Sequence, residues 1–452
     1  MASMPPHRGH QAHFAEFLGG ETEMNRTIGL RGILGAAALA LMPMALHAEQ
    51  TTIRMWTFLN PEGSTVREKV LGKLISNFEA SHPDIRVRTE QQVWDQMTPK
   101  FMAASGAGSA PDVIWVNSDL LGVVINSGAL ADIGSAFTAE DLADLDNPLV
   151  QSAMVEGKVY GVGQSYMIFG LIARQKFLDE AGVDAAAIRT WADLDAAAKK
   201  LTKRSGNSVE RWGLCQDLGM TKIDPGLLLA HLLTNDGDRP AFGQTGRADW
   251  SNDRGLAGIR HVTSLIEEGV SPREGLNWTN DEMYDQFSAG RCAMITGASV
   301  RIGSLQKATG DDDIAFIPYP SDDGAAPSRQ AISNWTTSVW EGSKHKEAAA
   351  QFVAYLVSPE ADALWVTEGG TLPARASTAR KLAQFLDKPT HRYMRAAGDY
   401  IRSSGWVPPF GADISGYRDD MNRAIQQVVM NGTDPKQALE QAEQAYNARH
   451  GY

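Results

Sequence analysis

The sequence predicts an α/β protein of two lobes. Its 452 residues exceed the size of one typical core, so two or more domains are expected. From residue 51 onward, apolar strand-like stretches alternate with amphipathic helical stretches, a pattern typical of parallel sheets with right-handed crossovers. The alternation restarts after residues 156–165, which predicts a second α/β lobe.

The first 48 residues (1–48) are expected to be a leader outside the fold. From Met24 the chain carries two arginines, an apolar run and small residues up to Ala48, which is the pattern of a secretory signal peptide. Residues 1–23 precede this better start and are expected to be an extension. No cysteine lies near the cleavage site, whereas a bacterial lipoprotein needs one at its new N-terminus. We therefore expect a periplasmic chain without a lipid anchor.

The first lobe begins with a buried strand at 51–58, which is rich in β-branched and apolar residues. A helix at 66–78 follows. Helical spacing places five apolar side chains on one of its faces, namely Val66, Val70, Leu71, Leu74 and Phe78. The next elements are a half-exposed strand at 84–91, a helix with Thr98 as its cap and Pro99 in its first turn, a buried strand at 111–116, and a short helix at 119–130 that ends at Gly128.

The second lobe opens with a hairpin at 156–165 that leads into a strand at 166–174. Thr190 is expected to cap a helix at 191–203. The other predicted elements are a helix at 175–181, a short strand at 212–217, an amphipathic helix at 256–270, a helix–turn–strand unit at 281–299, and a strand at 314–320.

The stretch "NWTTSVW" (334–340) is predicted to be a strand with two different faces. Side chains alternate along a strand, so Asn334 and Trp335 point in opposite directions. Two helices follow, and the expected boundaries are Ser343 as the cap of the first, Ser358-Pro359 at the start of the second, and Gly369-Gly370 at its end. A helical tail runs to Tyr452.

The sequence signatures of common enzyme classes are missing. HExxH, GxxxxGK[ST] and GxSxG do not occur, and two glycine-rich stretches, 106–111 and 161–166, fail the GxGxxG spacing. Histidines are scattered without metal-ligand spacing, so neither a metal site nor a cofactor is expected. The net charge of −12 without basic clusters excludes nucleic acid and anionic membranes as expected partners.

Two sequence features leave alternatives open. Cys215 and Cys292 either form a disulfide, which an exported compartment permits, or remain two separate buried thiols. Several tryptophans, among them Trp94, Trp278 and Trp406, lie in polar loops or at strand ends. An indole face packs well on the C–H face of a sugar ring, although any one of them can be an ordinary core residue. We expect at least two tryptophans to line a ligand cleft.

Nearly the whole mature chain resembles the family 1 extracellular solute-binding proteins of ABC importers, the maltose- and oligosaccharide-binding type. The resemblance is carried by ordered stretches that include "FEASHPDIRVRTE", "SGAGSAPDVIWVNSDLLGVVINSGALADI", "TWADLDAAAKKLT", "FSAGRCAMITGAS", "SKHKEAAAQFVAYLVSPE", "GGTLPAR" and "NGTDPKQALEQAEQ". Each stretch by itself is a weak match to the family, but the order and spacing of all the stretches together make the resemblance specific.

The resemblance implies a two-lobed periplasmic-binding-protein-like fold with hinge-connected parallel or mixed sheets, similar to type II binders. Lobe 1 would comprise 49–163 and 336–370, and lobe 2 would comprise 164–335 and 371–452. A monomer would capture a neutral carbohydrate, from a mono- to an oligosaccharide, by hinge closure and deliver it to the transmembrane permease subunits. No bond is made or broken, so no catalytic residue is expected.

The resemblance also implies a set of ligand contacts, with Asn334 as a hydrogen-bonding group and Trp335 as a stacking wall. Many members have a tryptophan where this chain has Ser299. Trp94 lies at a helix entry that can form a lid, and Arg375 either contacts the ligand or forms a structural ion pair. The full set is Phe58, Asn60, Trp94, Asn117, Ser118, Asp119, Tyr166, Gly297, Ser299, Asn334, Trp335, Arg375 and Trp406.

Three other functions stay open at this stage. A polyol or a glycerol-phosphate-type ester is the first alternative, but an anionic ligand requires basic groups or helix N-termini in the cleft. Arg375 is the one obvious basic candidate, which favours a neutral ligand. A secreted glycoside hydrolase or lyase is the second alternative, and a subunit that signals to a chemoreceptor cannot be distinguished from a transport subunit.

Overall fold

The computed structural model describes residues 50–94, 96–145, 153–220, 226–234, 241–243, 245–408 and 412–452. The predicted leader (1–48) lies outside the described residues. Within these ranges, no helix combines the length and the apolar character needed to cross a bilayer.

The first elements follow the predicted alternation of strands and helices. They are β1 (Thr51–Thr57), α1 (Val66–Ser81), β2 (Ile85–Gln91), α2 (Met97–Gly106), β3 (Val113–Asn117), α3 (Ser118–Asn126) and α4 (Ala139–Asp144). Helix α1 begins at a capping box in which Thr65 and Glu68 satisfy each other's backbone N–H groups. Two details of the prediction are wrong. Val66 is 60% exposed, and α2 begins after Gln96, so Thr98 is a buried residue of its first turn and not the cap.

The next elements form the second set of predicted strands and helices. They are β4 (Met154–Val155), β5 (Lys158–Val159), β6 (Val162–Arg174), α6 (Gln175–Ala181), α7 (Trp191–Leu201), β7 (Lys203–Ser205), β8 (Ser208–Cys215), α8 (Leu227–Leu232), α9 (Asp253–Glu267), α10 (Asn280–Ser288), β9 (Cys292–Ala298), η4 (Ser299–Arg301), α11 (Ile302–Thr309) and β10 (Ile314–Ile317). The capping of α7 by Thr190 is confirmed.

The chain then enters a long strand and a helical tail. The elements are β11 (Gln330–Val339), α12 (Lys346–Leu356), α13 (Pro359–Thr367), α14 (Ala376–Lys381), α15 (Ala383–Leu386), α16 (Arg392–Ser404), β12 (Gly405–Trp406), α17 (Ile414–Asn431) and α18 (Pro435–Arg449). Ser358 caps α13 and Pro359 opens it, as predicted. Ser343 does not cap α12, whose N-cap is His345. The Ser343 hydroxyl accepts from the His345 N–H at 2.9 Å, just before the helix, and donates to the buried Asp112 carboxylate at 2.5 Å.

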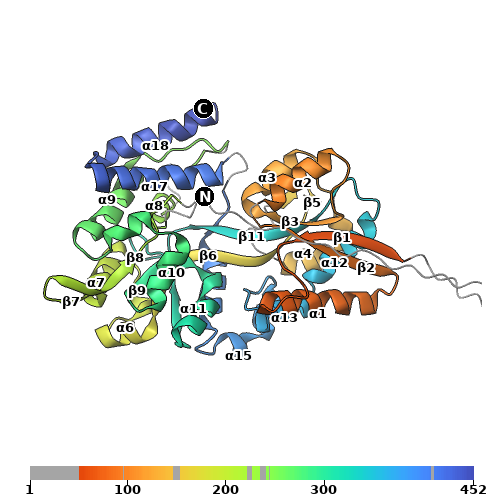
Figure 1. Cartoon of the computed structure of the whole chain (residues 1–452), viewed down its shortest axis with the longest axis horizontal. Helices are drawn as coiled ribbons and strands as arrows, with labels where there is room; N and C mark the ends of the chain where they lie inside the picture. Colours follow the sequence, from red (N-terminus) through yellow and green to blue (C-terminus); the bar gives the residue numbers. More distant parts are fainter. Residues whose placement is uncertain are drawn as a thin grey trace, which may run out of the picture. The chain divides into compact units, whose positions relative to one another are not determined.

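Ten of these strands join in one mixed sheet. Eight of them follow the path β2-β1-β3-β11-β6-β9-β8-β7, β10 pairs with β6, and β12 pairs with β11, while β4 and β5 pair separately with each other. The pairs β1/β2, β1/β3 and β8/β9 are parallel. The pairs that β11 makes with β3 and β6 are antiparallel, so β11 is hydrogen-bonded along both edges. Figure 1 shows β11 and β6 running between two groups of helices, with α1, α12 and α13 in one group and α7, α9 and α17 in the other.

Buried apolar residues fall into separate clusters along this sheet. One cluster takes its residues from Ile53–Val162 and Val339–Trp365. The residues of the two other clusters come from Tyr166 onward and include those of the helical tail. The chain passes between these clusters in β6, in β11 and just after Trp365.

The close contact between β6 and β11 depends on one glycine in β6, Gly163, and one just before it, Gly161. A side chain at Gly163 would collide with the amide of Asn334 and the ring of Tyr166, and one at Gly161 would collide with Ser338 and Thr336. These glycines therefore make room for the Asn334 face of β11. The predicted alternation is confirmed, because Thr337, on the other face, hydrogen-bonds Gln164 at 3.2 Å.

The two cysteines form a disulfide. Cys215 at the end of β8 is bonded to Cys292 at the start of β9, and both residues are buried. The sequence left open a disulfide or two separate buried thiols, and the structure contains the disulfide. The bond reinforces a parallel strand pair whose two strands are far apart along the chain.

We expect that removing this disulfide destabilises the protein without changing its fold. The bond joins residues 77 positions apart, and closing a loop of that length contributes about 2–4 kcal/mol. The Cys215→Ala/Cys292→Ala variant should unfold at a lower urea concentration than the wild type. Reductant should lower the wild-type midpoint and leave that of the variant unchanged. A wild-type midpoint that does not respond to reductant would contradict this expectation.

Candidate functional site

Three aromatic side chains meet where β1, β3 and β11 lie side by side. The Phe58 ring, just after β1, lies 4.8 Å from the Trp335 ring of β11 and 5.3 Å from the Trp115 ring of β3, measured between centroids. Trp115 is fully buried, whereas Phe58 and Trp335 are half-buried. We call these three residues the aromatic cluster. Its exposed part offers flat apolar faces at the edge of the sheet.

Polar groups at the start of α3 lie next to the aromatic cluster. Asn117 is the register partner of Trp335 and caps α3, with its side-chain oxygen accepting from the Asp119 N–H at 2.8 Å. The Ser118 hydroxyl accepts from the Asn334 N–H at 3.1 Å. The loops at the carboxyl ends of β1 and β3 therefore place rings and hydrogen-bonding groups at one edge, where α/β sheets generally bind ligands.

Asn334 and Trp335 point to opposite faces of β11. The Asn334 side chain is 1% exposed and lies against Gly163 and Tyr166 of β6. Its Nδ2 donor has no hydrogen-bond partner among the residues that the structure describes. A buried amide donor without a partner costs free energy, which marks this position as one that needs a further polar group.

Three arginines lie close to predicted contacts, in space or along the chain, and the sequence prediction included none of them. Arg418 of α17 donates to the Asp119 carboxylate at 3.0 Å and so joins α17 to α3. The Arg67 guanidinium, in the first turn of α1, lies 5.9 Å from the Phe58 ring centroid. Arg301, at the end of η4, stacks on Tyr284 and pairs with Asp281.

One sequence signal could have identified Arg67. The first turn of a helix carries the positive end of the macrodipole, so an arginine there is unfavourable unless it has another role. No such local signal marks Arg301 or Arg418.

The other predicted contacts are spread over several environments. Asn60 lies in the turn before α1, and its side-chain oxygen accepts from the Glu62 N–H. Trp94 is 60% exposed before α2. Gly297 lies inside the buried strand β9, next to Ile172 and Tyr284. The Ser299 hydroxyl accepts from the Ile168 N–H at 3.3 Å. Trp406 packs in the core on Phe242.

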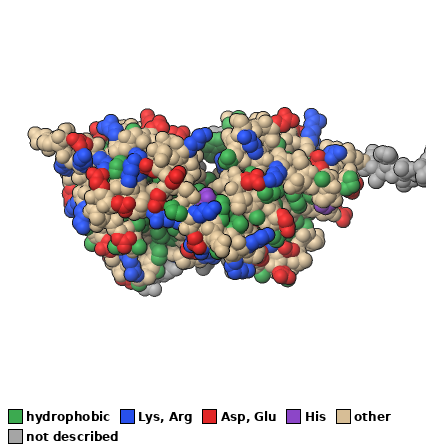
Figure 2. Space-filling model, turned by 90° about the horizontal axis from the view of Figure 1, so that it is seen from below, with side chains coloured by type: hydrophobic (Ala, Val, Ile, Leu, Met, Phe, Trp, Pro, Cys, Tyr) green, Lys and Arg blue, Asp and Glu red, His purple; other side chains and the backbone are tan. Residues whose placement is uncertain are grey.

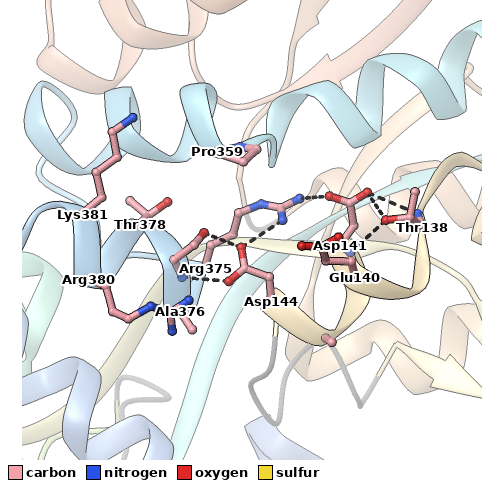
Figure 3. Close-up of a pocket in the computed structure, with 12 residues that line it drawn as sticks. Thr138, Glu140, Asp141, Asp144, Pro359, Arg375, Ala376, Thr378, Arg380 and Lys381 are labelled. Carbon is pink, nitrogen blue, oxygen red and sulfur yellow. Dashed lines mark hydrogen bonds and ion pairs between the residues drawn. The ribbon is translucent and has the colours of Figure 1, made fainter.

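Arg375 lies in a separate cavity of about 740 Å³. Figure 3 shows its guanidinium pointing toward two carboxylates of α4, and the nitrogen–oxygen distances are 3.1 Å to Asp141 and 3.2 Å to Asp144. Its Nε donates to the Val357 carbonyl. The cavity is lined by Thr138, Glu140, Asp141, Ala143, Asp144, Pro359, Arg375, Ala376, Ser377, Thr378, Arg380 and Lys381. Arg375 therefore forms the structural ion pair that was one of its two expected roles.

The two carboxylates that face Arg375 are held in their ionised form. The pKa of Asp141 is lowered by hydrogen bonds from Thr138 and also by Arg375. Burial raises the pKa of Asp144, but hydrogen bonds from Ser377 and the Arg375 guanidinium outweigh it and lower the pKa overall. The network ties α4 to the segment after α13.

The described residues contain no group of three or more histidine, cysteine, aspartate or glutamate side chains placed to hold a metal ion. Figure 2 shows acidic and basic side chains interspersed over the face that it draws. That face therefore carries no large patch of a single charge, which a nucleic-acid partner would require.

We expect Arg375→Met to lower stability and to leave solute binding intact. The change leaves Asp141 and Asp144 without their cation, and breaking a buried pair of this kind costs about 3 kcal/mol. The melting temperature should fall, while the shift that a bound solute adds should persist. Arg380→Met is the matched control, because Arg380 lines the same cavity but is exposed, and its melting temperature should stay near the wild-type value. Normal stability with a lost ligand shift would instead make Arg375 a ligand contact.

Curated relatives cover much of the chain at low identity. An uncharacterized lipoprotein of Streptomyces antibioticus is 26% identical over 299 residues, which is 64% of this chain and 63% of that protein's own length. The sn-glycerol-3-phosphate-binding periplasmic protein UgpB of Escherichia coli O1:K1 is 25% identical over 361 residues, 76% of this chain and 79% of UgpB.

Solved structures agree with the sheet and its helices. The sugar-binding protein MalE from Xanthomonas citri superimposes with a TM-score of 0.73 at 18% identity, over 89% of this chain and 98% of that one. A likeness at this identity shows the fold, and it confirms the predicted two-lobed α/β class. The model of the bacterial extracellular solute-binding proteins matches residues 59–363, more than half of the chain. The chain belongs to the bacterial extracellular solute-binding protein family.

Proposed function

We propose that this chain is the solute-binding subunit of an ABC importer, and that it captures a carbohydrate between two lobes and delivers it to transmembrane permease subunits. The observation that carries the proposal is the aromatic cluster beside the start of α3. Phe58 and Trp335 offer half-exposed ring faces, and the polar side chains of Asn117, Ser118 and Asp119 lie next to them. Rings take the C–H face of a sugar and polar groups take its hydroxyls.

The proposed lobes keep the boundaries expected from the sequence, 49–163 with 336–370 and 164–335 with 371–452. The separate apolar clusters support this division, because the chain passes between them near residue 164, near residue 336 and after residue 365. Three crossing segments of this kind would act together as a hinge.

The ion pair between Asp119 and Arg418 supports closure of one lobe on the other. It joins α3 of the proposed lobe 1 to α17 of the proposed lobe 2. A solute that contacts both lobes would favour the closed form over the open form. The solute can shift this equilibrium only by as much as its affinities for the closed and open forms differ.

The printed names of relatives fit a hydroxylated solute. The MalE relative is named a sugar-binding protein and UgpB an sn-glycerol-3-phosphate-binding protein. We propose that the mature chain is a monomer that binds its solute without chemical change, and that it is free in the periplasm. One relative is named a lipoprotein, so the absence of an anchor is tested by cell fractionation and by the mass of the mature chain.

We expect Trp335→Ala to abolish or strongly reduce the thermal shift caused by the bound carbohydrate. Loss of one stacking face and its buried area weakens binding about 10-fold or more, and the shift falls with it because stabilisation depends on ligand concentration relative to Kd. The measurement is a thermal-shift screen of mono-, di- and oligosaccharides and polyols, followed by titration of the best solute.

Trp94→Ala is the matched control, because it removes an exposed indole outside the aromatic cluster. An unchanged shift in Trp335→Ala would remove Trp335 from the site, and a shift lost in Trp94→Ala would support a lid there. Product analysis after long incubation tests the absence of catalysis. Turnover of the bound carbohydrate would refute the function as a whole.

A further inference from the structure

The ion pair between Asp119 and Arg418 connects two helices that are remote in the chain. Asp119 lies in the first turn of α3, and Arg418 lies in α17, 299 positions later. The Arg418 Nη1 donates to the Asp119 Oδ2 at 3.0 Å, and the two side chains are 11% and 22% exposed. Figure 1 shows α3 and α17 in different groups of helices. The ion pair therefore depends on how these two groups approach each other.

Arg418 is fixed to the proposed lobe 2 by the helix that carries it. Arg418, Asn422 and Gln426 are spaced four positions apart, so their side chains lie on one face of α17. The amides of Asn422 and Gln426 donate to backbone carbonyls of the segment after β8 (218–219), and Gln426 also donates to one in η3 (Arg273–Asn277). These bonds attach the same face of α17 to lobe 2, so the Arg418 guanidinium moves with that lobe.

Asp119 is fixed to the proposed lobe 1 beside the aromatic cluster. Its N–H donates to the side chain of Asn117, which is the register partner of Trp335. Arg418 occupies one carboxylate oxygen, Oδ2. Within the part of the chain that the structure describes, no residue donates a hydrogen bond to the other oxygen, Oδ1. The carboxylate thus keeps one strong acceptor next to the aromatic rings.

A second ion pair also joins the proposed lobes, but it lies at the hinge. Arg375 follows shortly after the third crossing segment and pairs with Asp141 and Asp144 of α4. A group so close to a crossing segment moves little when the lobes rotate. Helix α17 contains no crossing segment, so opening the lobes would separate Arg418 from Asp119. The Arg418 pair is therefore the one that depends on closure.

The positive charge of Arg418 also determines which solutes closure can accept. Closing the lobes removes water from the Asp119 carboxylate, and a carboxylate that loses its water without a counter-charge is costly. Arg418 supplies that counter-charge from the opposite lobe, so the solute does not need to carry a cation. A hydroxyl is then sufficient to satisfy the remaining oxygen of Asp119.

We propose that Arg418 is a positioning residue of the solute site. On closure it binds Asp119 Oδ2 across the two lobes, neutralises the carboxylate, and leaves Oδ1 as the acceptor for a hydroxyl of an uncharged solute. Arg418 thus acts on the solute through Asp119 and links closure to affinity. The inference rests on the proposed function, since it concerns the same solute and the same closure.

The test is a double-mutant cycle at the two ends of the ion pair. Wild type, Arg418→Met, Asp119→Asn and the double variant are titrated with the tightest-binding neutral carbohydrate from the thermal-shift screen. Arg418→Lys keeps the charge and loses the planar guanidinium, and it provides the comparison if Arg418→Met does not fold. Arg423→Met is the matched control, because Arg423 is an exposed arginine of the same helix. Melting temperatures without solute show which variants fold.

Arg418→Met should raise the Kd about 10-fold, mostly through faster dissociation, because the closed form loses a contact between the lobes. Arg418→Lys should lose less affinity, and Arg423→Met should bind as the wild type does. The double variant should bind no more weakly than Asp119→Asn, because Arg418 acts through Asp119. Losses that add in the double variant would overturn the inference, as would equal affinities of Arg418→Met and Arg423→Met.

Salt provides a readout that a purely structural role would not move. The carbohydrate is uncharged, so screening acts on charges of the protein and not on the solute. Raising the salt from about 20 mM to about 500 mM should weaken binding by the wild type and by Arg423→Met about 2-fold or more, and leave the Kd of Arg418→Met nearly unchanged. The same salt dependence in all three proteins would contradict the role of Arg418.

Two results separate failure of this inference from failure of the function. Binding of a neutral carbohydrate that is lost in Trp335→Ala and unaffected by Arg418→Met would overturn the positioning role and leave the proposed function in place. Failure of every carbohydrate and polyol in the screen to bind the wild type would overturn both.

Discussion

The arrangement of the whole site depends on β11 being hydrogen-bonded along both edges. Its backbone pairs with β3 on one side and β6 on the other, so its register cannot slip without breaking two ladders. That register directs Trp335 toward Phe58 and buries Asn334 against Gly163. A shift of one residue would exchange the two side chains between faces, and the aromatic cluster would disappear.

Two arginines show how differently one residue type can be used. Arg375 has two carboxylates and a carbonyl around its guanidinium, so its charge stabilises the contact between α4 and the segment after α13. The Arg67 guanidinium lies 5.9 Å from the Phe58 ring centroid, and burial lowers its pKa while the neighbouring Glu68 carboxylate acts in the opposite direction. The first charge is thus held by direct ion pairs, whereas the second lies beside an aromatic ring and next to one carboxylate in the chain.

Local sequence patterns predicted the helices and strands of this fold well. Two predicted helix caps, Thr98 and Ser343, are wrong. Helical periodicity located α1 and α7, and the capping signals of Thr190 and Ser358 are confirmed. Ser343 is not the cap because α12 begins only after His345; the Ser343 hydroxyl accepts from the His345 N–H before the helix and donates to the buried Asp112. A serine that accepts a backbone N–H near a helix start is therefore not always its cap, because the exact first residue of the helix depends on tertiary packing.

The sequence by itself determined the order of strands and helices, the two faces of residues 334–340, and the resemblance to solute-binding proteins, because these depend on periodicity and on short ordered motifs. Only the tertiary structure decided that Cys215 and Cys292 are bonded, that Trp335 meets Phe58, and which charges are paired. The physical reason is that these interactions depend on distances in space between residues remote in the chain. No local pattern specifies that Arg375 reaches Asp144 or that Arg418 reaches Asp119.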